Sequence, residues 1–187
     1  RAGANVPITD DPDDFAAADG VVLPGVGAFR EGMENAGPYR EALADAVDRG
    51  QPVFGICLGM QMLLTSSEEA DHAGEGEVVG LDFVPGRNVR FDEGQKVPHM
   101  GWNQLSVGET THSSPASSGE HAYFVHSYYA VPDDDGAVVA TADHGRTFPA
   151  VIASDDGLVF GTQFHPEKSG ETGLTILRNF VDICYTN

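Results

Sequence analysis

The chain has 187 residues, with 10 Lys plus Arg against 29 Asp plus Glu, and its formal net charge is −19. Nucleic acids and anionic membranes are bound through basic surface, so this composition argues against both as partners. The length suits one domain with a substantial core. The acidic residues are scattered along the chain, which predicts a solvated acidic surface. Such a surface resembles that of proteins from salt-accumulating halophiles.

Cysteine and histidine usage is sparse. The two cysteines, Cys57 and Cys184, make no disulfide framework, and no apolar run approaches the length of a membrane span. A cytoplasmic protein is therefore predicted. The sequence opens at Arg1 without methionine, and no signal peptide is visible in it. The seven histidines are dispersed and no C-x-x-C or H-x-x-x-H pair exists, so neither a metal nor a cofactor is expected.

The first third of the chain alternates short apolar runs with helical patterns. In order, the predicted elements are a strand over residues 5–9, a short helix over 10–18 capped by Asp10 or Asp11, a strand over 21–23, a helix over 38–49, a strand over 53–56 and the first turns of a helix over 60–64. This rhythm predicts right-handed crossovers and a parallel sheet with helices on both faces. Ligands of such sheets bind beyond the carboxyl ends of the strands.

The second half changes character. It contains successive predicted strands over residues 81–91, 95–107, 121–131, 137–142, 150–154 and 158–164, several joined by glycine turns, so this region is expected to be largely antiparallel. A final helix over residues 170–185 has one apolar face, and Cys184 on that side is predicted to be a core residue.

Residues 52–61 combine a strand pattern with a G-x-C-x-G motif, the cysteine counterpart of a nucleophile elbow. Gly55 and Gly59 permit close approach of strand and helix, and Cys57 is expected at the apex. The positive end of the following helix favours the thiolate, and the Leu58 N–H can donate to an oxyanion. The alternative is an inert core cysteine.

Two further stretches can serve this cysteine. The loop Pro24-Gly25-Val26-Gly27 is either an oxyanion loop or a plain turn between a strand and a helix. In F-H-P-E over residues 164–167, His165 and Glu167 project to the same side of an extended segment, so the carboxylate can orient the imidazole as a base. The alternative is a strand end with a surface ion pair between Glu167 and Lys168.

Five motifs in register carry a resemblance to a known family. They are P-G-V-G-A-F at residues 24–29, G-I-C-L-G-M-Q at 55–61, P-H-M-G-W-N at 98–103, Y-F-V-H-S-Y-Y at 123–129 and F-H-P-E at 164–167. The chain resembles the class I (triad) glutamine amidotransferases, and among them the glutaminase subunits of imidazole glycerol phosphate synthase, of histidine biosynthesis. The resemblance implies a flavodoxin-like, mostly parallel central sheet with an added antiparallel region.

The resemblance also implies roles. Cys57 would attack the glutamine amide, with His165 as base oriented by Glu167, and the oxyanion would be held by the Leu58 N–H and one from Gly25, Val26 or Gly27. Gln61, Ser127 and Tyr128 are similar to positions that bind the glutamine backbone. Ammonia would pass to a (β/α)8 barrel cyclase subunit in a heterodimer, and the residues that resemble its contacts are Met100, Trp102, Tyr123 and Lys168.

One departure and several alternatives stay open. The family opens with a strand, a glycine-rich turn and a helix that do not precede Arg1, so residues 1–187 are predicted to be a single amidotransferase domain that lacks this start, and we expect those residues in the working protein. The alternatives are a guanylate or anthranilate synthase component, a stand-alone cysteine hydrolase or peptidase with an open groove, and a binding or regulatory module. The mark of such a module would be a broken triad, and here none of the three members is missing.

Overall fold

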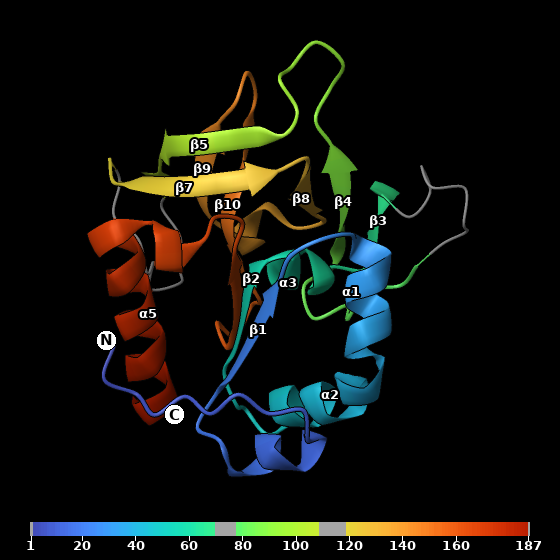
Figure 1. Ribbon diagram of the computed structural model, residues 1–187, viewed down its shortest axis with the longest axis vertical. Helices are drawn as coiled ribbons and strands as arrows, with labels where there is room; N and C mark the ends of the chain where they lie inside the picture. The colour runs from blue at the N-terminus through green and yellow to red at the C-terminus, as the bar shows by residue number, and fades with distance from the viewer. Residues whose placement is uncertain (1, 70–77, 109–118, 187) are drawn as a thin grey trace.

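The structure, a computed structural model, describes residues 2–69, 78–108 and 119–186, and it is an α/β arrangement (Figure 1). Its helices are α1 (Phe29–Ala36), α2 (Arg40–Asp48), α3 (Leu58–Met62) and α5 (Gly170–Thr186), with 3-10 turns η1 (Pro12–Ala17), η2 (Gly37–Tyr39), η3 (Asp135–Ala137) and η4 (Pro166–Lys168). Its strands are β1 (Val21–Gly25), β2 (Val53–Cys57), β3 (Ser66–Ser67), β4 (Gly86–Arg90), β5 (His99–Gln104), β6 (Ser106–Val107), β7 (His121–His126), β8 (Tyr128–Pro132), β9 (Val138–Asp143), β10 (Thr147–Ala153) and β11 (Val159–Thr162).

The main sheet has the strand order β1-β2-β11-β10-β9-β6. Strands β1, β2 and β11 run parallel, and β10, β9 and β6 continue the sheet in antiparallel pairing. Two smaller sheets, β3-β4-β8 and β5-β7, lie beside it. The predicted fold class, a parallel region with antiparallel strands added by the second half of the chain, is confirmed.

Both faces of the main sheet are buried because apolar side chains alternate along its strands. Val53 on β2 belongs to the core under α1, α2 and α3, whereas its neighbour Phe54 belongs to the core under α5. The Phe54 and Phe180 rings lie 5.4 Å apart, which ties α5 to the sheet. Helices therefore cover both faces, as the sequence predicts (Figure 1).

Three predictions about elements need correction. Residues 5–9 form no strand, and Val6 and Ile8 are exposed instead of pairing with the edge strand β1. Helix α1 was not predicted, although its buried residues Phe29, Met33 and Ala36 have helical spacing. Helix α3 begins directly after Cys57 and ends at Met62, so it is earlier and shorter than the predicted range of 60–64.

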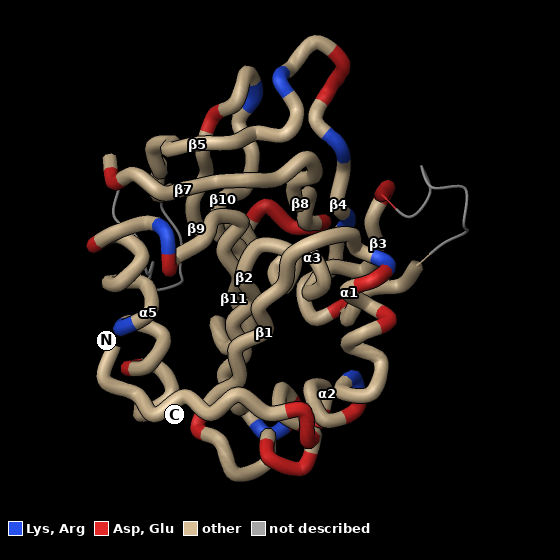
Figure 2. The backbone as a smooth tube through the Cα atoms, viewed as in Figure 1, with Lys and Arg blue, Asp and Glu red and all other residues tan. Residues whose placement is uncertain are grey.

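The other expectations compare simply with the structure. Asp11 caps η1, as one of the two predicted caps. Cys184 is half-buried and packs against the core under α5. Acidic residues lie on many loops and helices of the described chain instead of forming one tail (Figure 2). Within residues 2–69, 78–108 and 119–186, no helix has the length and apolar character needed to cross a bilayer.

Candidate active site

Cys57 lies at a strained turn between β2 and α3. Its backbone has φ 54° and ψ −107°, a conformation that non-glycine residues rarely adopt. The neighbouring glycines make the turn possible: a Cβ at Gly55 would lie 2.7 Å from the Gly59 carbonyl carbon, and one at Gly59 would lie 1.8 Å from the Leu23 oxygen. The packing of β1, β2 and α3 therefore holds the cysteine at the carboxyl end of the parallel strands.

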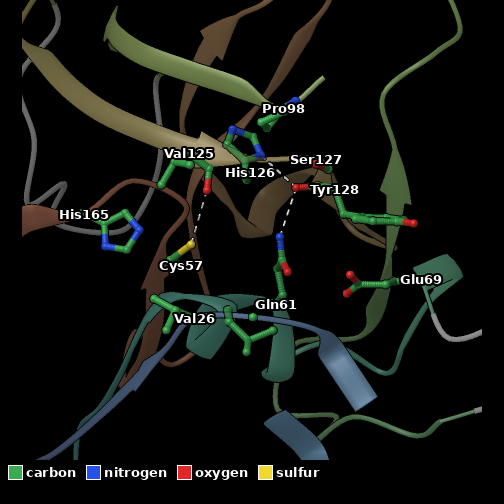
Figure 3. A pocket seen from close by; sticks show the side chains of 12 residues that line it. Val26, Cys57, Gln61, Glu69, Pro98, Val125, His126, Ser127, Tyr128 and His165 are labelled. Atoms are coloured by element: carbon green, nitrogen blue, oxygen red, sulfur yellow. Dashed lines mark hydrogen bonds between the residues drawn. The ribbon is translucent and has the colours of Figure 1, made fainter. Parts of the chain in front are cut away.

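A pocket of about 280 Å³ opens over this turn (Figure 3). Its walls come from the loop after β1, from α3, and from the junction of β7 and β8. The lining residues are Val26, Gly27, Cys57, Leu58, Gln61, Glu69, Pro98, Val125, His126, Ser127, Tyr128 and His165. The volume is that of a small-metabolite site and not of a groove for an extended peptide.

The Cys57 sulfur is buried and stays a thiol at neutral pH. Burial raises its pKa to about 11, against the lowering effects of a hydrogen bond from the Leu58 N–H, of the Gln163 side chain and of the Lys168 charge. The expected stabilisation of the thiolate at the start of α3 is present as the hydrogen bond from the Leu58 N–H, but desolvation of the buried sulfur outweighs it. The thiol needs a base before it can act as a nucleophile.

His165 faces the same pocket from the segment after β11 (Figure 3). Its Nδ1 lies 2.8 Å from Glu167 Oε1, and its Nε2 is buried with no hydrogen-bond partner among the described residues. The Glu167 carboxylate therefore pairs with the His165 imidazole, and not with Lys168 as in the alternative of a surface ion pair. A ring nitrogen that has no partner among the described residues, and whose ring lines the same pocket as a thiol, can accept a proton.

The loop over residues 24–27 packs closely on the elbow. A Cβ at Gly25 would lie 2.9 Å from the Leu58 Cβ, and Gly27 has φ +103°, in the left-handed region that glycine tolerates. Val26 and Gly27 line the pocket, whereas Gly25 ends β1 and is not among the lining residues. The loop connects β1 to α1, as expected of a plain turn between a strand and a helix, and it also forms part of the pocket wall.

The three residues predicted to bind the glutamine backbone lie together. Gln61 is buried, and its Nε2 donates to the Tyr128 carbonyl at 3.0 Å and to Gln163 Oε1 at 3.1 Å. Ser127 is the single residue between β7 and β8, and Tyr128 begins β8. Ser127 and Tyr128 lie across the pocket from Val26, and the Gln61 side chain reaches toward them from α3 (Figure 3).

Glu69 is a lining residue that sequence reasoning assigned to the acidic surface. Its Oε2 accepts a hydrogen bond of 2.8 Å from the Phe29 N–H at the start of α1, which orients the carboxylate. Among the described residues that line the pocket, it is the one with a carboxylate. No short motif marks it, because its place depends on contacts between segments 40 residues apart.

The four residues predicted to face a partner gather on the outer face of the β5–β7 pair. Met100 and Trp102 are 60% and 58% exposed, and Trp102 pairs across the strands with Tyr123. The Trp102 and Tyr123 rings are 6.1 Å apart, and Lys168 Nζ lies 5.9 Å from the Tyr123 ring centroid. Met, Trp and Tyr side chains are enriched in protein interfaces, so the composition of this exposed cluster suits a docking surface.

The part of the chain that the structure describes holds no cluster of three His, Cys, Asp or Glu side chains arranged to bind a metal ion. The site is therefore built from a thiol, an imidazole–carboxylate pair and a polar wall. Such a set suits nucleophilic acyl transfer to the sulfur, with backbone N–H groups as donors to the oxyanion.

Comparison with known proteins identifies relatives of the whole chain. The family described as "Glutamine amidotransferase class-I" matches residues 4–184. The subunit HisH of imidazole glycerol phosphate synthase from Natronomonas pharaonis is 72% identical over 184 residues, which cover 98% of this chain and 86% of that protein. The HisH of Methanothermobacter thermautotrophicus is 49% identical over 98% of this chain and 88% of that protein.

Solved structures share the fold at lower identity. A crystal structure of a glutamine amidotransferase aligns with a TM-score of 0.72 at 20% identity, over 98% of this chain and 88% of that one. A putative GMP synthase protein from Thermoplasma acidophilum aligns with a TM-score of 0.66 at 23% identity, over 95% of this chain and 78% of that one. The resemblance read from five sequence motifs is confirmed by the family match and by the HisH relatives.

Proposed function

Since the chain belongs to the class-I glutamine amidotransferases, and within them to the family of imidazole glycerol phosphate synthase subunits HisH, we propose that it hydrolyses glutamine to glutamate and ammonia for histidine biosynthesis. The observation that carries the proposal is that Cys57 and His165 line the same pocket. The pocket is small, so it suits one amino acid better than a peptide, which disfavours a stand-alone peptidase.

Glutamine would enter with its amide toward Cys57 and its backbone toward the polar wall. The Glu69 carboxylate, held by the Phe29 N–H, is available to pair with the α-ammonium group. Gln61 and the strand junction at Ser127 and Tyr128 would contact the remaining polar groups. These contacts would fix the distance between the amide carbon and the sulfur, which lowers the entropic part of the barrier.

The triad would then transfer the acyl group to sulfur. Because burial raises the pKa of Cys57 to about 11, attack requires that His165 Nε2 takes the thiol proton as the S–C bond forms. Glu167 holds Nδ1 and stabilises the imidazolium. The oxyanion would accept from the Leu58 N–H and from one N–H of the loop Gly25-Val26-Gly27.

Collapse of the tetrahedral intermediate would release ammonia. The imidazolium gives its proton to the amide nitrogen, the C–N bond breaks, and a thioester of glutamate remains on Cys57. Water, deprotonated by His165, then attacks the thioester carbon and the thiol leaves with the proton returned. The charges and protons balance without a metal or cofactor.

The ammonia would pass to a (β/α)8 barrel cyclase subunit docked in a heterodimer on the face of Met100, Trp102, Tyr123 and Lys168. That subunit would use it to make imidazole glycerol phosphate and an aminoimidazole carboxamide ribotide. Support comes from the pocket wall itself: the Val125 carbonyl accepts from the Cys57 thiol at 3.9 Å, and Val125 lies on the same strand as Tyr123. The reacting sulfur therefore lies against the backbone of the strand that carries Tyr123.

Three further parts of the proposal rest mainly on sequence. We propose that residues 1–187 are one amidotransferase domain, which agrees with a family match over residues 4–184. A cytoplasmic location is proposed from the cysteine usage. Adaptation to high salt is proposed from the net charge of −19.

Replacement of the nucleophile tests the function. Cys57→Ala is expected to reduce glutamine-dependent synthesis by the assembled enzyme by at least about 10⁴-fold, while synthesis from added ammonium stays intact. Cys184→Ala is the matched control, since that cysteine lies in the core under α5, and it should keep both activities. Loss of both activities in Cys57→Ala, with normal binding of the partner, would contradict the assignment.

A further inference from the structure

Two buried histidines at the pocket wall are not used by the triad: His126 is itself a lining residue, and His99 is hydrogen-bonded to it. His99 on β5 and His126 on β7 are 5% and 6% exposed, and they lie opposite each other in the strand pair. Their rings pack against Phe91, Phe124 and Phe148. Burial in this aromatic setting lowers the pKa of His99 to about 4 and that of His126 to about 3, so both rings are neutral at physiological pH.

Asn103 determines which nitrogen of His99 carries the hydrogen. The Asn103 Oδ1 accepts from the Gln104 N–H at 2.8 Å, so its amide nitrogen is the donor at the other end. That nitrogen lies 2.6 Å from the Asp143 carbonyl and 3.2 Å from His99 Nε2. His99 Nε2 is therefore an acceptor, and the neutral ring has its hydrogen on Nδ1.

The same logic fixes the second ring. His99 Nδ1 lies 3.0 Å from His126 Nε2, which must accept, so His126 also has its hydrogen on Nδ1. That Nδ1 lies 2.8 Å from the Tyr128 carbonyl and donates to it. Every bond in this histidine chain, from Asn103 through His99 and His126 to the Tyr128 carbonyl, points in one direction.

The histidine chain ends where the sheet hydrogen bonds change partners. Strand β7 pairs with β5 up to His126, and β8 pairs with β4 from Tyr128, so Ser127 lies between two different sheets. At this junction the Tyr128 carbonyl receives two side-chain donors, His126 Nδ1 and Gln61 Nε2 (Figure 3). Side chains thus replace the regular strand pairing at the wall of the pocket.

Gln61, the second donor to the Tyr128 carbonyl, connects this junction to the nucleophile. Gln61 Nε2 also bonds to Gln163 Oε1 at 3.1 Å, and Gln163 Nε2 lies 3.9 Å from the Cys57 sulfur. A displacement of the Tyr128 carbonyl would therefore move both the wall that faces the ligand and the amide that contacts the thiol.

We infer that His99 and His126 are positioning residues for glutamine. As two neutral imidazoles with the hydrogen on Nδ1, they hold the wall formed by Ser127 and Tyr128 in its place in the pocket. The inference rests on the proposed function for the identity of the ligand. The rings act through the backbone and not on the reacting atoms. Each Nε2 must stay unprotonated, because each accepts the bond that orients its ring.

The tautomers are tested by nuclear magnetic resonance of the purified chain labelled with ¹⁵N in its histidines. Two rings, assigned by their loss in His99→Phe and His126→Phe, are expected to show neutral Nδ1–H tautomers that persist from pH 7 to pH 5. Neutral Nε2–H tautomers, or protonation of either ring near pH 6, would overturn the inference. This readout needs no activity, so it is separate from a failure of the proposed function.

Kinetics of the enzyme assembled with its cyclase partner test the positioning role. His126→Phe keeps a ring but removes the donor to Tyr128, and it is expected to raise KM for glutamine about 10-fold, with kcat within about three-fold of wild type and ammonium-driven synthesis unchanged. His126→Asn keeps an N–H near the Nδ1 position, so part of this KM effect should be recovered. A fall in kcat with unchanged KM, as in a partly unfolded sample, would contradict the inference.

His144→Phe is the matched control. The His144 ring stacks on His99 at 4.3 Å between centroids, but its Nε2 bonds to the Lys96 carbonyl and not to the histidine chain. The variant keeps the stack, so KM should stay within about two-fold of wild type. An equal rise of KM in His144→Phe and His126→Phe would mean that aromatic packing, and not the hydrogen-bond direction, sets the wall.

Discussion

The two sides of the pocket are held in place by different physics. On the side of β1, β2 and α3, close backbone packing that only glycine allows positions Cys57, with Gly59 against the Leu23 oxygen. On the side of β5, β7 and β8, hydrogen bonds between side chains and the Tyr128 carbonyl position the wall. Substitutions on the side with the nucleophile should therefore disrupt the structure through steric overlap. Substitutions on the recognition side should weaken glutamine binding through the loss of single hydrogen-bond donors.

After replacement of the nucleophile, the largest effect is expected from replacement of the base. His165→Ala should lower kcat for glutamine about 10³-fold, because the Cys57 thiol, with a pKa of about 11, then has no acceptor for its proton. Steady-state release of glutamate by the assembled enzyme measures this. The synthesis driven by ammonium serves as the internal control, and a kcat within ten-fold of wild type would show that another group takes the proton.

Steric overlap on the elbow side should be the next largest effect. Gly59→Ala would place a Cβ 1.8 Å from the Leu23 oxygen, so the free energy of unfolding should fall by about 3 kcal/mol or more. Denaturant unfolding measures the loss. Gly37→Ala is the matched control, since Gly37 has φ −48° and no atom within 4 Å of its added Cβ. Equal stability of both variants would refute the steric account of the elbow.

A smaller effect is expected from the loss of one charge on the recognition side. Glu69→Gln keeps the shape and an oxygen for the Phe29 N–H but removes the negative charge, so KM for glutamine should rise about 10-fold with little change in kcat. Glu68→Gln is the matched control because Glu68 is not among the lining residues and its Oε2 accepts from the Arg90 N–H instead. A rise of KM in Glu68→Gln but not in Glu69→Gln would contradict the assignment of Glu69 as the partner of the ammonium group.

The smallest expected effect applies to both sides alike. With a net charge of −19, self-repulsion should weaken the fold in dilute buffer, and raising the salt from about 0.1 M to 1 M shortens the screening length from about 10 Å to 3 Å. The melting temperature should rise by roughly 5 °C over this range. Calorimetry in sodium chloride measures it, and a flat or falling melting temperature would remove the proposed adaptation to salt.

The sequence predicted the elbow side better than the recognition side. The turn at Cys57 is local, since Gly55, Cys57 and Gly59 lie within five residues, and the parallel pairing of β1 with β2 follows from the alternation of elements. Residues 5–9 mislead because Val6 and Ile8 fit a strand pattern, yet they pair with nothing in the described chain.

On the recognition side, the residues depend on contacts that no short pattern encodes. Glu69 reads as one acid among many, and it enters the pocket wall only because β3 and α1 bring it to the Phe29 N–H. His99 and His126 are visible in two motifs, but their tautomers follow from Asn103 and from burial. The motif indicates the lowering effect of the Leu58 N–H on the pKa of Cys57, but the larger cost of burying the sulfur cannot be read from it.

The central claim is that Cys57 and His165 act together on glutamine in one pocket. The most direct measurement is labelling of the assembled enzyme with a glutamine-mimicking electrophile, followed by peptide mapping. One label per chain is predicted on Cys57, blocked by excess glutamine and slowed strongly in His165→Ala. Labelling of Cys184, or labelling of Cys57 that neither glutamine nor His165→Ala affects, would contradict it.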